Sequence, residues 1–204
     1  MDVEIGNEAA VPVGGNMTEE RVATVTAVDP SALTPSAMRG LRDIGSQATW
    51  WLSTCKPGFG VDHLRDNSLE TYWQSDGQQP HFININFKRK TSVKAICFYV
   101  DYRQDESYTP SRISVRVGNN MLDLVEVAKV EMVEPSGWIN VDLDSGKDDS
   151  VRAFMLQVAI LSNHQNGRDT HLRQVKVYTP ALSTPSQLNL NFTSPLLAQF
   201  RDLK

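Results

Sequence analysis

The heptapeptide HFININF, residues 81–87, decides the fold class. Ile83, Ile85 and Phe87 occupy alternate positions, and an asparagine separates each from the next. Successive side chains of a β-strand point to opposite faces of a sheet, so the apolar residues share one face and the asparagines the other. This alternation is typical of an antiparallel sheet that packs one face on a core and leaves the other to solvent.

The same two-residue period recurs in three later segments: Ile113/Val115/Val117, Ile139/Val141/Leu143 and Val175/Val177. Residues 93–100 and 153–161 are apolar almost throughout, which predicts central strands covered on both faces over part of their length. Turn residues separate about eight such segments, and the chain shows no repeat of 20 to 50 residues. The sequence therefore predicts an all-β fold, an antiparallel β-sandwich of the jelly-roll type.

Two segments are less regular. Residues 124–133 fit either a kinked strand pair or a helical turn. The sequence also allows a short helix over residues 36–43, because Pro35 and Ser36 suit its start and Gly45 suits its end.

Composition divides the chain into three parts. Residues 1–40 mix glycine, proline and acidic residues without a sustained period, which predicts a mostly disordered, flexible arm. Residues 41–180 are expected to form the sandwich domain. Residues 181–204 loosen again and are expected to form a flexible C-terminal tail with apolar anchors.

Composition and charge exclude several classes of function. The 204 residues are 40% hydrophobic, enough for one core, and the formal net charge is −4 without a basic stripe, so no nucleic-acid partner is expected. No apolar run is long enough to cross a bilayer, and the acidic start is unlike a secretory signal, so we expect an intracellular protein without a membrane partner. Cys55 and Cys97 are expected to be ordinary reduced thiols.

Polar residues gather in three loops, at residues 64–77, 101–110 and 162–171. In an antiparallel sandwich, loops separated by an even number of strands emerge at the same end, so these loops are expected to form one surface. The third loop is dense in hydrogen-bond donors and acceptors, and Tyr108 adds a rigid amphipathic ring. Such a surface suits an extended polar peptide or a sugar.

The third loop also contains residue types that bind metals. His164, Asp169 and His171 would need further fixed ligands to hold zinc, and the neighbouring residues are those of turns. We therefore expect no metal and no cofactor. Instead, residues 166–167 (Asn-Gly) are expected to form a tight turn, with Arg168 and Asp169 paired to brace it.

A hydrolase is the competing interpretation from a different class. Ser107 or Thr109 would act as nucleophile with His171 and Asp169. The sequence has no nucleophile elbow and no glycine cluster for an oxyanion hole, so no catalytic residue is expected. Turnover of generic ester, peptide or glycoside substrates would distinguish this alternative.

The first loop contains large apolar residues among its polar ones. Because large aromatics dominate protein cores, Trp73 is expected to plug the end of the sandwich together with Leu69 and Tyr72. Asp66 and Asp76 are expected to supply loop hydrogen bonds, with oxygen ligands for a calcium ion as the alternative.

Five ordered segments together resemble one known family: residues 55–58 (CKPG), 69–77 (LETYWQSDG), 105–111 (DESYTPS), 133–138 (VEPSGW) and 163–171 (NHQNGRDTH). They look like the DOC-domain subunits of the anaphase-promoting complex, a ubiquitin ligase of the cell cycle. The resemblance implies a galactose-binding-like jelly roll that is not itself an enzyme. It also implies nuclear and cytoplasmic localisation, and as partners the TPR, cullin and RING subunits, a WD40 co-activator and destruction-box substrates.

In this family the subunit and the co-activator together form the receptor for the destruction box, an extended degron, and promote processive ubiquitination. The resemblance places degron binding in two loops, at Ser107, Tyr108, Thr109, Asn163, His164, Asn166, Arg168, Asp169 and His171. Amides and hydroxyls there would bind the degron backbone. Arg168 and Asp169 would shape the cleft or meet charged degron residues.

The family also ends in an Ile-Arg dipeptide that inserts into a TPR groove of the scaffold. This chain ends in Leu203-Lys204, which keeps an aliphatic anchor followed by a cation but lacks the planar fork of arginine. We expect the tail to dock, more weakly than an arginine would. A carbohydrate-binding sandwich outside the complex is the alternative binding module; such modules normally present aromatic platforms and work outside the cell.

Overall fold

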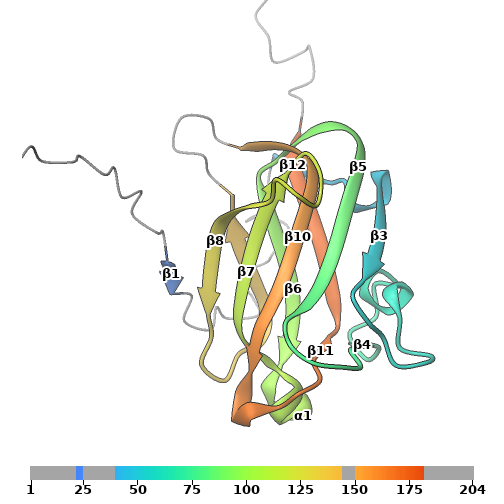
Figure 1. Cartoon of the computed structure of the whole chain (residues 1–204), viewed down its shortest axis with the longest axis vertical. Coiled ribbons are helices and arrows are strands. Elements are labelled where there is room, and N and C mark those ends of the chain that lie inside the picture. The colour runs from blue at the N-terminus through green and yellow to red at the C-terminus, as the bar shows by residue number, and fades with distance from the viewer. Residues whose placement is uncertain (1–21, 25–39, 144–149, 182–204) are drawn as a thin grey trace, which may run out of the picture.

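The computed structural model of the chain describes residues 22–24, 40–143 and 150–181, and most of them lie in β-strands (Figure 1). Eight of the described strands contain five residues or more: β3 (Ala48–Leu52), β5 (His81–Val93), β6 (Ala95–Asp101), β7 (Pro110–Gly118), β8 (Val125–Glu131), β9 (Ser136–Asp142), β10 (Val151–Asn163) and β12 (Gln174–Pro180). Four are shorter: β1 (Val22–Thr24), β2 (Leu41–Asp43), β4 (Trp73–Gln74) and β11 (His171–Leu172).

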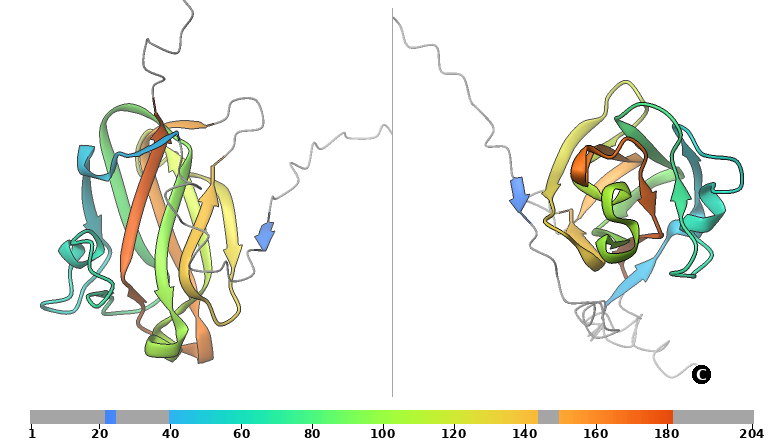
Figure 2. Two further views of the ribbon diagram at one scale, coloured as in Figure 1. Left: turned by 180° about the vertical axis from the view of Figure 1, so that it is seen from behind. Right: turned by 90° about the horizontal axis from the view of Figure 1, so that it is seen from below.

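The long strands form two sheets that lie face to face (Figures 1 and 2). The strand order of the larger sheet is β1-β8-β7-β10-β5-β3, and that of the smaller is β2-β12-β6-β9. Neighbouring strands are antiparallel, except that β1 runs parallel to β8. β4 and β11 form a separate antiparallel ribbon. The predicted all-β antiparallel sandwich is confirmed.

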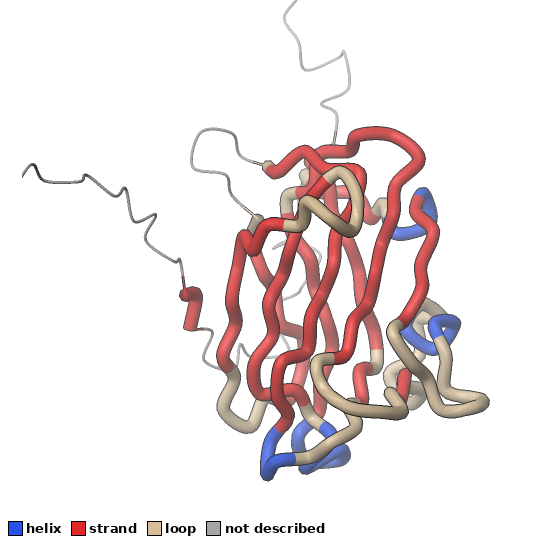
Figure 3. Tube along the Cα trace, viewed as in Figure 1, coloured by secondary structure: helices blue, strands red, loops and turns tan. Residues whose placement is uncertain are grey.

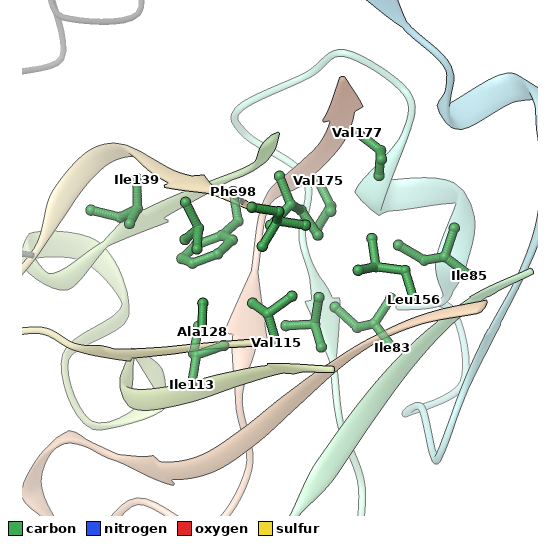
Figure 4. Packing of buried hydrophobic residues seen from close by; sticks show 14 of the residues in the cluster. Ile83, Ile85, Phe98, Ile113, Val115, Ala128, Ile139, Leu156, Val175 and Val177 are labelled. Carbon is green, nitrogen blue, oxygen red and sulfur yellow. The ribbon is translucent and has the colours of Figure 1, made fainter. Parts of the chain in front are cut away.

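The hydrophobic core fills the space between the two sheets (Figure 4). Ile83 and Leu156 enter it from the larger sheet, and Phe98 and Val175 enter it from the smaller one; all four are at most 2% exposed. The apolar positions of residues 81–87 have the expected cause, since Ile83, Ile85 and Phe87 join this cluster. On the opposite face Asn86 is exposed, but Asn84 is buried and accepts a hydrogen bond from Gln157, so that face is not wholly left to solvent.

The described helices are short and lie between strands: η2 (Gly45–Gln47), η3 (Val61–Leu64), α1 (Tyr102–Asp105), η4 (Glu106–Tyr108) and η5 (His164–Asn166). None of these helices is long and apolar enough to cross a membrane. Asp101 caps α1, because its carboxylate accepts a hydrogen bond of 3.1 Å from the backbone N–H of Arg103. α1, η4 and η5 lie together at one end of the sandwich (Figure 3), and they position the second and third polar loops.

The strands confirm some of the predicted elements and correct others. β6 and β10, predicted to be central, have strand neighbours on both sides in their sheets. Of residues 124–133, Val125–Glu131 form the single strand β8, so neither the strand pair nor the helical turn is right. The expected kink is present as a register shift against β7 between Val115 and Arg116. The expected helix over residues 36–43 is wrong where it can be checked, because Leu41–Asp43 is β2 and pairs with β12.

Parts of the predicted flanking segments lie outside the described residues. Within the predicted N-terminal arm of residues 1–40, the structure describes Gly40 and Val22–Thr24, and the latter add to the sheet as β1, an element that the sequence did not predict. Of the predicted C-terminal tail, residues 182–204 are outside the described part of the chain.

Leu156→Ala is expected to lower the free energy of unfolding by about 2–5 kcal/mol, because it leaves a cavity in the centre of the core. Leu122→Ala is the matched control, since the Leu122 side chain is 97% exposed, and it should change stability by about 0.5 kcal/mol at most. Urea unfolding followed by tryptophan fluorescence measures both. Similar losses in the two variants would contradict the placement of Leu156.

Candidate functional site

The three polar loops meet at one end of the sandwich, as expected (Figures 1 and 2). The first and third are joined by the β4–β11 ribbon and by two hydrogen bonds, from the Ser75 N–H to the Thr170 carbonyl (3.1 Å) and from the Thr170 N–H to the Ser75 hydroxyl (2.8 Å). The second and third are joined by a bond of 2.9 Å from the His164 N–H to the Thr109 carbonyl. The loops that carry Tyr108 and Arg168 are therefore neighbours.

A buried ion pair ties all three loops to one another. The Arg173 guanidinium donates two hydrogen bonds of 2.9 Å to the Asp105 carboxylate and one of 2.7 Å to the carbonyl of Leu69. The Asp105 carboxylate also lies 3.1 Å from Nδ1 of His171. Asp105 is 6% exposed and Arg173 is 3% exposed, so water screens the pair little. The second loop supplies the anion and the first supplies a carbonyl. The donors are His171 of the third loop and Arg173, which lies between β11 and β12.

The ion pair shifts the pKa values of both partners. Burial by itself raises the pKa of the Asp105 carboxyl, but the hydrogen bonds from His171 and Arg173 and their charges outweigh it, so the pKa lies below its ordinary value. Burial likewise opposes the charge of Arg173, and the bonds to Asp105 hold the pKa of its guanidinium above the ordinary value. Both groups are therefore charged in the folded protein at neutral pH.

A column of aromatic rings stands beside the ion pair. The His171 ring is stacked between Tyr108 and Tyr72, with centroid distances of 4.2 Å and 4.1 Å. Phe59 continues the column, with its ring 5.2 Å from that of Tyr72. His171 is buried, whereas Tyr108 is 39% exposed. The column thus supports one exposed aromatic ring on a rigid base.

The third loop approaches the second closely at Gly167. A Cβ at this position would overlap the Ser107 carbonyl, so only glycine fits. The preceding residue, Asn166, has a φ of 56°, a left-handed conformation that asparagine tolerates. The Asn163 amide closes the turn from within, by donating to the carbonyls of Gly167 (3.2 Å) and Asp169 (2.8 Å). A turn is present, but one residue earlier than the predicted position 166–167: the Gly167 N–H donates to the His164 carbonyl at 2.9 Å, and Gln165 and Asn166 are its left-handed central residues.

The nine predicted site residues all lie at this end, but they differ in exposure. Three are exposed: Tyr108, Asn166 and Arg168. Three are partly exposed: Ser107, His164 and Asp169. The remaining three are buried: Thr109, Asn163 and His171. The buried residues shape the surface from within and do not present their side chains to a ligand at the surface.

Arg168 and Asp169 do not brace their turn by pairing, as the sequence suggested; both bind the backbone of Gly77. Arg168 Nε donates to the Gly77 carbonyl (3.0 Å), and the Gly77 N–H donates to the Asp169 carboxylate (3.3 Å). The two side chains therefore join the third loop to the first. This correction arises because the sequence could not show which residue of the first loop lies beside them.

The metal and hydrolase interpretations place their residues in arrangements that the structure does not have. His164 contacts the Thr109 carbonyl and the Glu134 N–H, whereas Asp169 contacts Gly77. Among the described residues, no group of three or more His, Cys, Asp and Glu side chains could hold a metal ion. The expected partner of His171 in a hydrolase was Asp169, and this is wrong, because Asp105 occupies that place.

The first loop agrees with its prediction in part. Trp73 is fully buried, and its indole N–H donates to the Thr54 carbonyl at 3.0 Å, so it is a core residue. Leu69 is 37% exposed, so its predicted place in the core is wrong. Its backbone carbonyl, and not its side chain, contributes to the site by accepting a hydrogen bond from Arg173. Asp66 accepts hydrogen bonds from Thr71, Ser68 and Gln174, which confirms its role in the loop.

Sequence analysis missed the residues that hold the site together. Asp105 lies in one of the quoted segments, but nothing in the sequence links it to Arg173, 68 positions later. Phe59 and Tyr72 were not connected with His171 either. The sequence does contain single polar residues beside apolar strand residues. Such residues indicate buried hydrogen-bonded pairs, but the sequence does not show which residue each of them bonds.

Comparison with known proteins decides the family. The family model described as anaphase-promoting complex, subunit 10 (APC10), matches residues 20–201. The chain belongs to this family. This assignment confirms the resemblance read from the five sequence segments.

Curated relatives of the APC10 family span distant eukaryotes. The chain is 66% identical to anaphase-promoting complex subunit 10 of Homo sapiens over 140 residues, which is 69% of this chain and 76% of the human protein. It is 55% identical to the Drosophila melanogaster subunit over 140 residues, covering 69% and 72% of the two chains. Identity to the Dictyostelium discoideum subunit is 47% over 163 residues, covering 79% and 86%.

Solved structures share the fold at low sequence identity. A family 32 carbohydrate-binding module of Clostridium perfringens NanJ, solved with galactose, is 14% identical with a TM-score of 0.58 and covers 68% of this chain and 99% of that one. An F5/8 type C domain from Bacteroides fragilis is 11% identical with a TM-score of 0.57, covering 70% and 99%. These neighbours confirm the galactose-binding-like jelly roll expected for the APC10 family.

Asp105→Asn is expected to lower the free energy of unfolding by about 3–5 kcal/mol at pH 7, because it leaves the Arg173 charge buried without its partner. The folded-state pKa of Asp105 lies below its value of about 3.8 in the unfolded chain. The wild type therefore has the full benefit of this carboxylate above about pH 4 and loses it as the pH falls through the folded pKa.

The difference in free energy of unfolding between wild type and Asp105→Asn should accordingly become smaller below about pH 4. Urea unfolding from pH 3 to pH 7 tests this. Asp123→Asn is the matched control, since Asp123 also has a lowered pKa but bonds only its own exposed loop. If the difference in free energy of unfolding between wild type and Asp105→Asn stays constant from pH 3 to pH 7, the ionised state assigned to Asp105 is contradicted.

Proposed function

We propose that this subunit is a non-catalytic substrate receptor of the anaphase-promoting complex. In this role it binds the destruction box of cell-cycle proteins together with a WD40 co-activator and makes their ubiquitination processive. The observation that carries the proposal is the joining of three loops, distant in sequence, into one firmly braced polar surface around the exposed Tyr108 ring. Membership of the APC10 family supports the same role.

The chemistry of the surface fits an extended peptide. Tyr108 offers a flat amphipathic face, and its stacking on His171 limits the entropy that the ring loses on binding. The exposed side chains of Asn166 and Arg168 supply an amide and a cation beside it. An extended segment has unpaired backbone groups and can bind such donors and acceptors along its length.

A shared receptor explains how a modest surface can select a degron. The exposed part of the cluster is small, and a disordered peptide loses conformational entropy when it is ordered, so one half of a binding cleft gives weak affinity. A WD40 co-activator that contributes the other half would raise the affinity through combined contacts. We further propose that the chain works in the nucleus and the cytoplasm, where its partners would meet cell-cycle substrates.

The variant Tyr108→Ala/Asn166→Gly is expected to reduce processive ubiquitination of a destruction-box substrate about tenfold, because loss of a binding anchor costs roughly 1–2 kcal/mol. Glycine at position 166 keeps the left-handed backbone. The measurement counts ubiquitins added per binding event by the reconstituted complex. Val125→Ala, exposed on β8, is the control.

Assembly of the variant into the complex must be unchanged for this comparison. A variant that assembles and retains full processivity would contradict the placement of the degron on this surface. Tighter binding of galactose than of a destruction-box peptide by the wild-type chain with its co-activator would favour the carbohydrate-binding alternative.

We also propose that Leu203 and Lys204, which lie outside the described residues, dock the chain to a TPR subunit. Deletion of both residues is expected to abolish binding to that scaffold, and Lys204→Arg is expected to strengthen it, because a guanidinium can bind a carboxylate through two hydrogen bonds. Co-purification with the scaffold, quantified by mass spectrometry, measures both effects. Scaffold binding that survives the deletion undiminished would rule out this role.

A further inference from the structure

The larger sheet ends on an edge strand whose own sequence and register lack the usual protective features, although η3 contacts the strand. β3 has a strand neighbour, β5, on one side only, and it lies at the margin of the sheet in every view (Figures 1, 2 and 3). Its sequence, ATWWL, contains no charged residue and no proline, and its register with β5 is continuous without a bulge. Soluble proteins usually protect an exposed edge with one of these devices, because unpaired backbone groups template the addition of another strand.

The register shows which backbone groups of β3 face outward. The Ser53 N–H donates to the Phe82 carbonyl at 2.9 Å, so this pair is of the hydrogen-bonded type. In an antiparallel ladder such pairs alternate with pairs that are not hydrogen-bonded to each other. The N–H and carbonyl groups of Trp50 and Leu52 therefore point away from β5. An added strand could bond these groups without disturbing the existing ladder.

The outer face of β3 offers a contact for the side chains of such a strand. Trp50 packs against the core, so alternation places Trp51 on the opposite face, and Trp51 is 38% exposed. A large aromatic beside an open edge can pack against a cross-strand neighbour.

A basic cavity adjoins the start of the same strand. Its volume is about 440 Å³, and its walls include Lys88 and Arg89 of β5 together with Ser46, Thr49 and Thr91, whose hydroxyl donates to the Arg89 carbonyl at 2.8 Å. Lys88 and Arg89 are exposed, and within the described residues neither forms an ion pair. Lys90 follows them, so three cations are successive in the sequence of a chain whose net charge is −4. Cations and hydroxyls together suit carboxylates.

We propose that β3 accepts an extended, acidic segment of another protein as an additional strand, with the acidic residues of that segment in the basic cavity. The open edge supplies main-chain hydrogen bonds, and the cavity fixes which end of the segment carries the charge. One end of β3 approaches the loop surface, since Leu52 pairs with Ile83, but the basic cavity lies at the other end of the strand. His81, at the start of β5, contacts Arg168 of the loop surface, whereas Thr91 in the cavity wall lies ten residues further along, about 30 Å away for a strand. The inference therefore does not depend on the proposed degron receptor.

The test uses the full chain and two fluorescein-labelled peptides, TVTVTDEDE and DEDETVTVT, which carry the acidic block at opposite ends. Fluorescence anisotropy should show saturable binding of at least one of them. The double variant Lys88→Glu/Arg89→Glu is expected to weaken that binding at least tenfold. Lys56→Glu/Lys129→Glu makes the same change in net charge elsewhere on the surface and should leave binding within twofold.

Methylation of the peptide backbone tests strand addition separately. N-methyl groups at every second residue of the threonine-valine part remove the N–H groups on one edge of the peptide. One of the two alternate sets should abolish binding, and the other should leave it within threefold. Failure of both peptides to bind, equal binding to the Lys88/Arg89 variant, or equal effects of the two methylation sets would overturn the proposal.

Discussion

The functional end of this molecule depends on the buried ion pair between Asp105 and Arg173. Charges removed from water are costly unless each is fully hydrogen-bonded. The Arg173 guanidinium meets that condition only when the Asp105 carboxylate and the Leu69 carbonyl are both in place. Because these groups come from different loops, the pair is satisfied only when the loops are assembled together. One interaction thus couples three segments that the β-sandwich alone would leave independent.

That coupling explains how a rigid surface arises from loops. Asp105 also binds His171, which fixes the imidazole between the rings of Tyr72 and Tyr108. The exposed tyrosine is therefore held by a chain of buried contacts that leads back to the ion pair. Arg168 and Asp169 extend the same principle by binding Gly77 of the first loop. A surface organised before binding loses less entropy when a flexible ligand arrives.

The features of this fold that could be predicted from the sequence are those that follow from the periodicity of its apolar residues. Six of the eight long strands follow from alternation and apolar runs, whereas β3 was not predicted and β8 was left open between a strand pair and a helical turn. The meeting of the loops follows from counting the strands between them. Partners in buried polar pairs could not be predicted, since Asp105 and Arg173 carry no local signal of each other. The two-residue strands β4 and β11 are too short for any period to show. Leu69 was misplaced because hydrophobicity alone does not reveal that its carbonyl, and not its side chain, is the group used.

Backbone hydrogen exchange in wild type and in Arg173→Met, which keeps the bulk but removes the charge, measures how strongly the ion pair couples the three loops. The amides of Ser75 and His164 bridge different loops. Loss of the ion pair is expected to speed exchange at both amides together, on the order of 100-fold for about 3 kcal/mol. Amides in the centre of β7 and β10 should change little. Faster exchange confined to residues next to position 173, with Ser75 and His164 unaffected, would contradict the account.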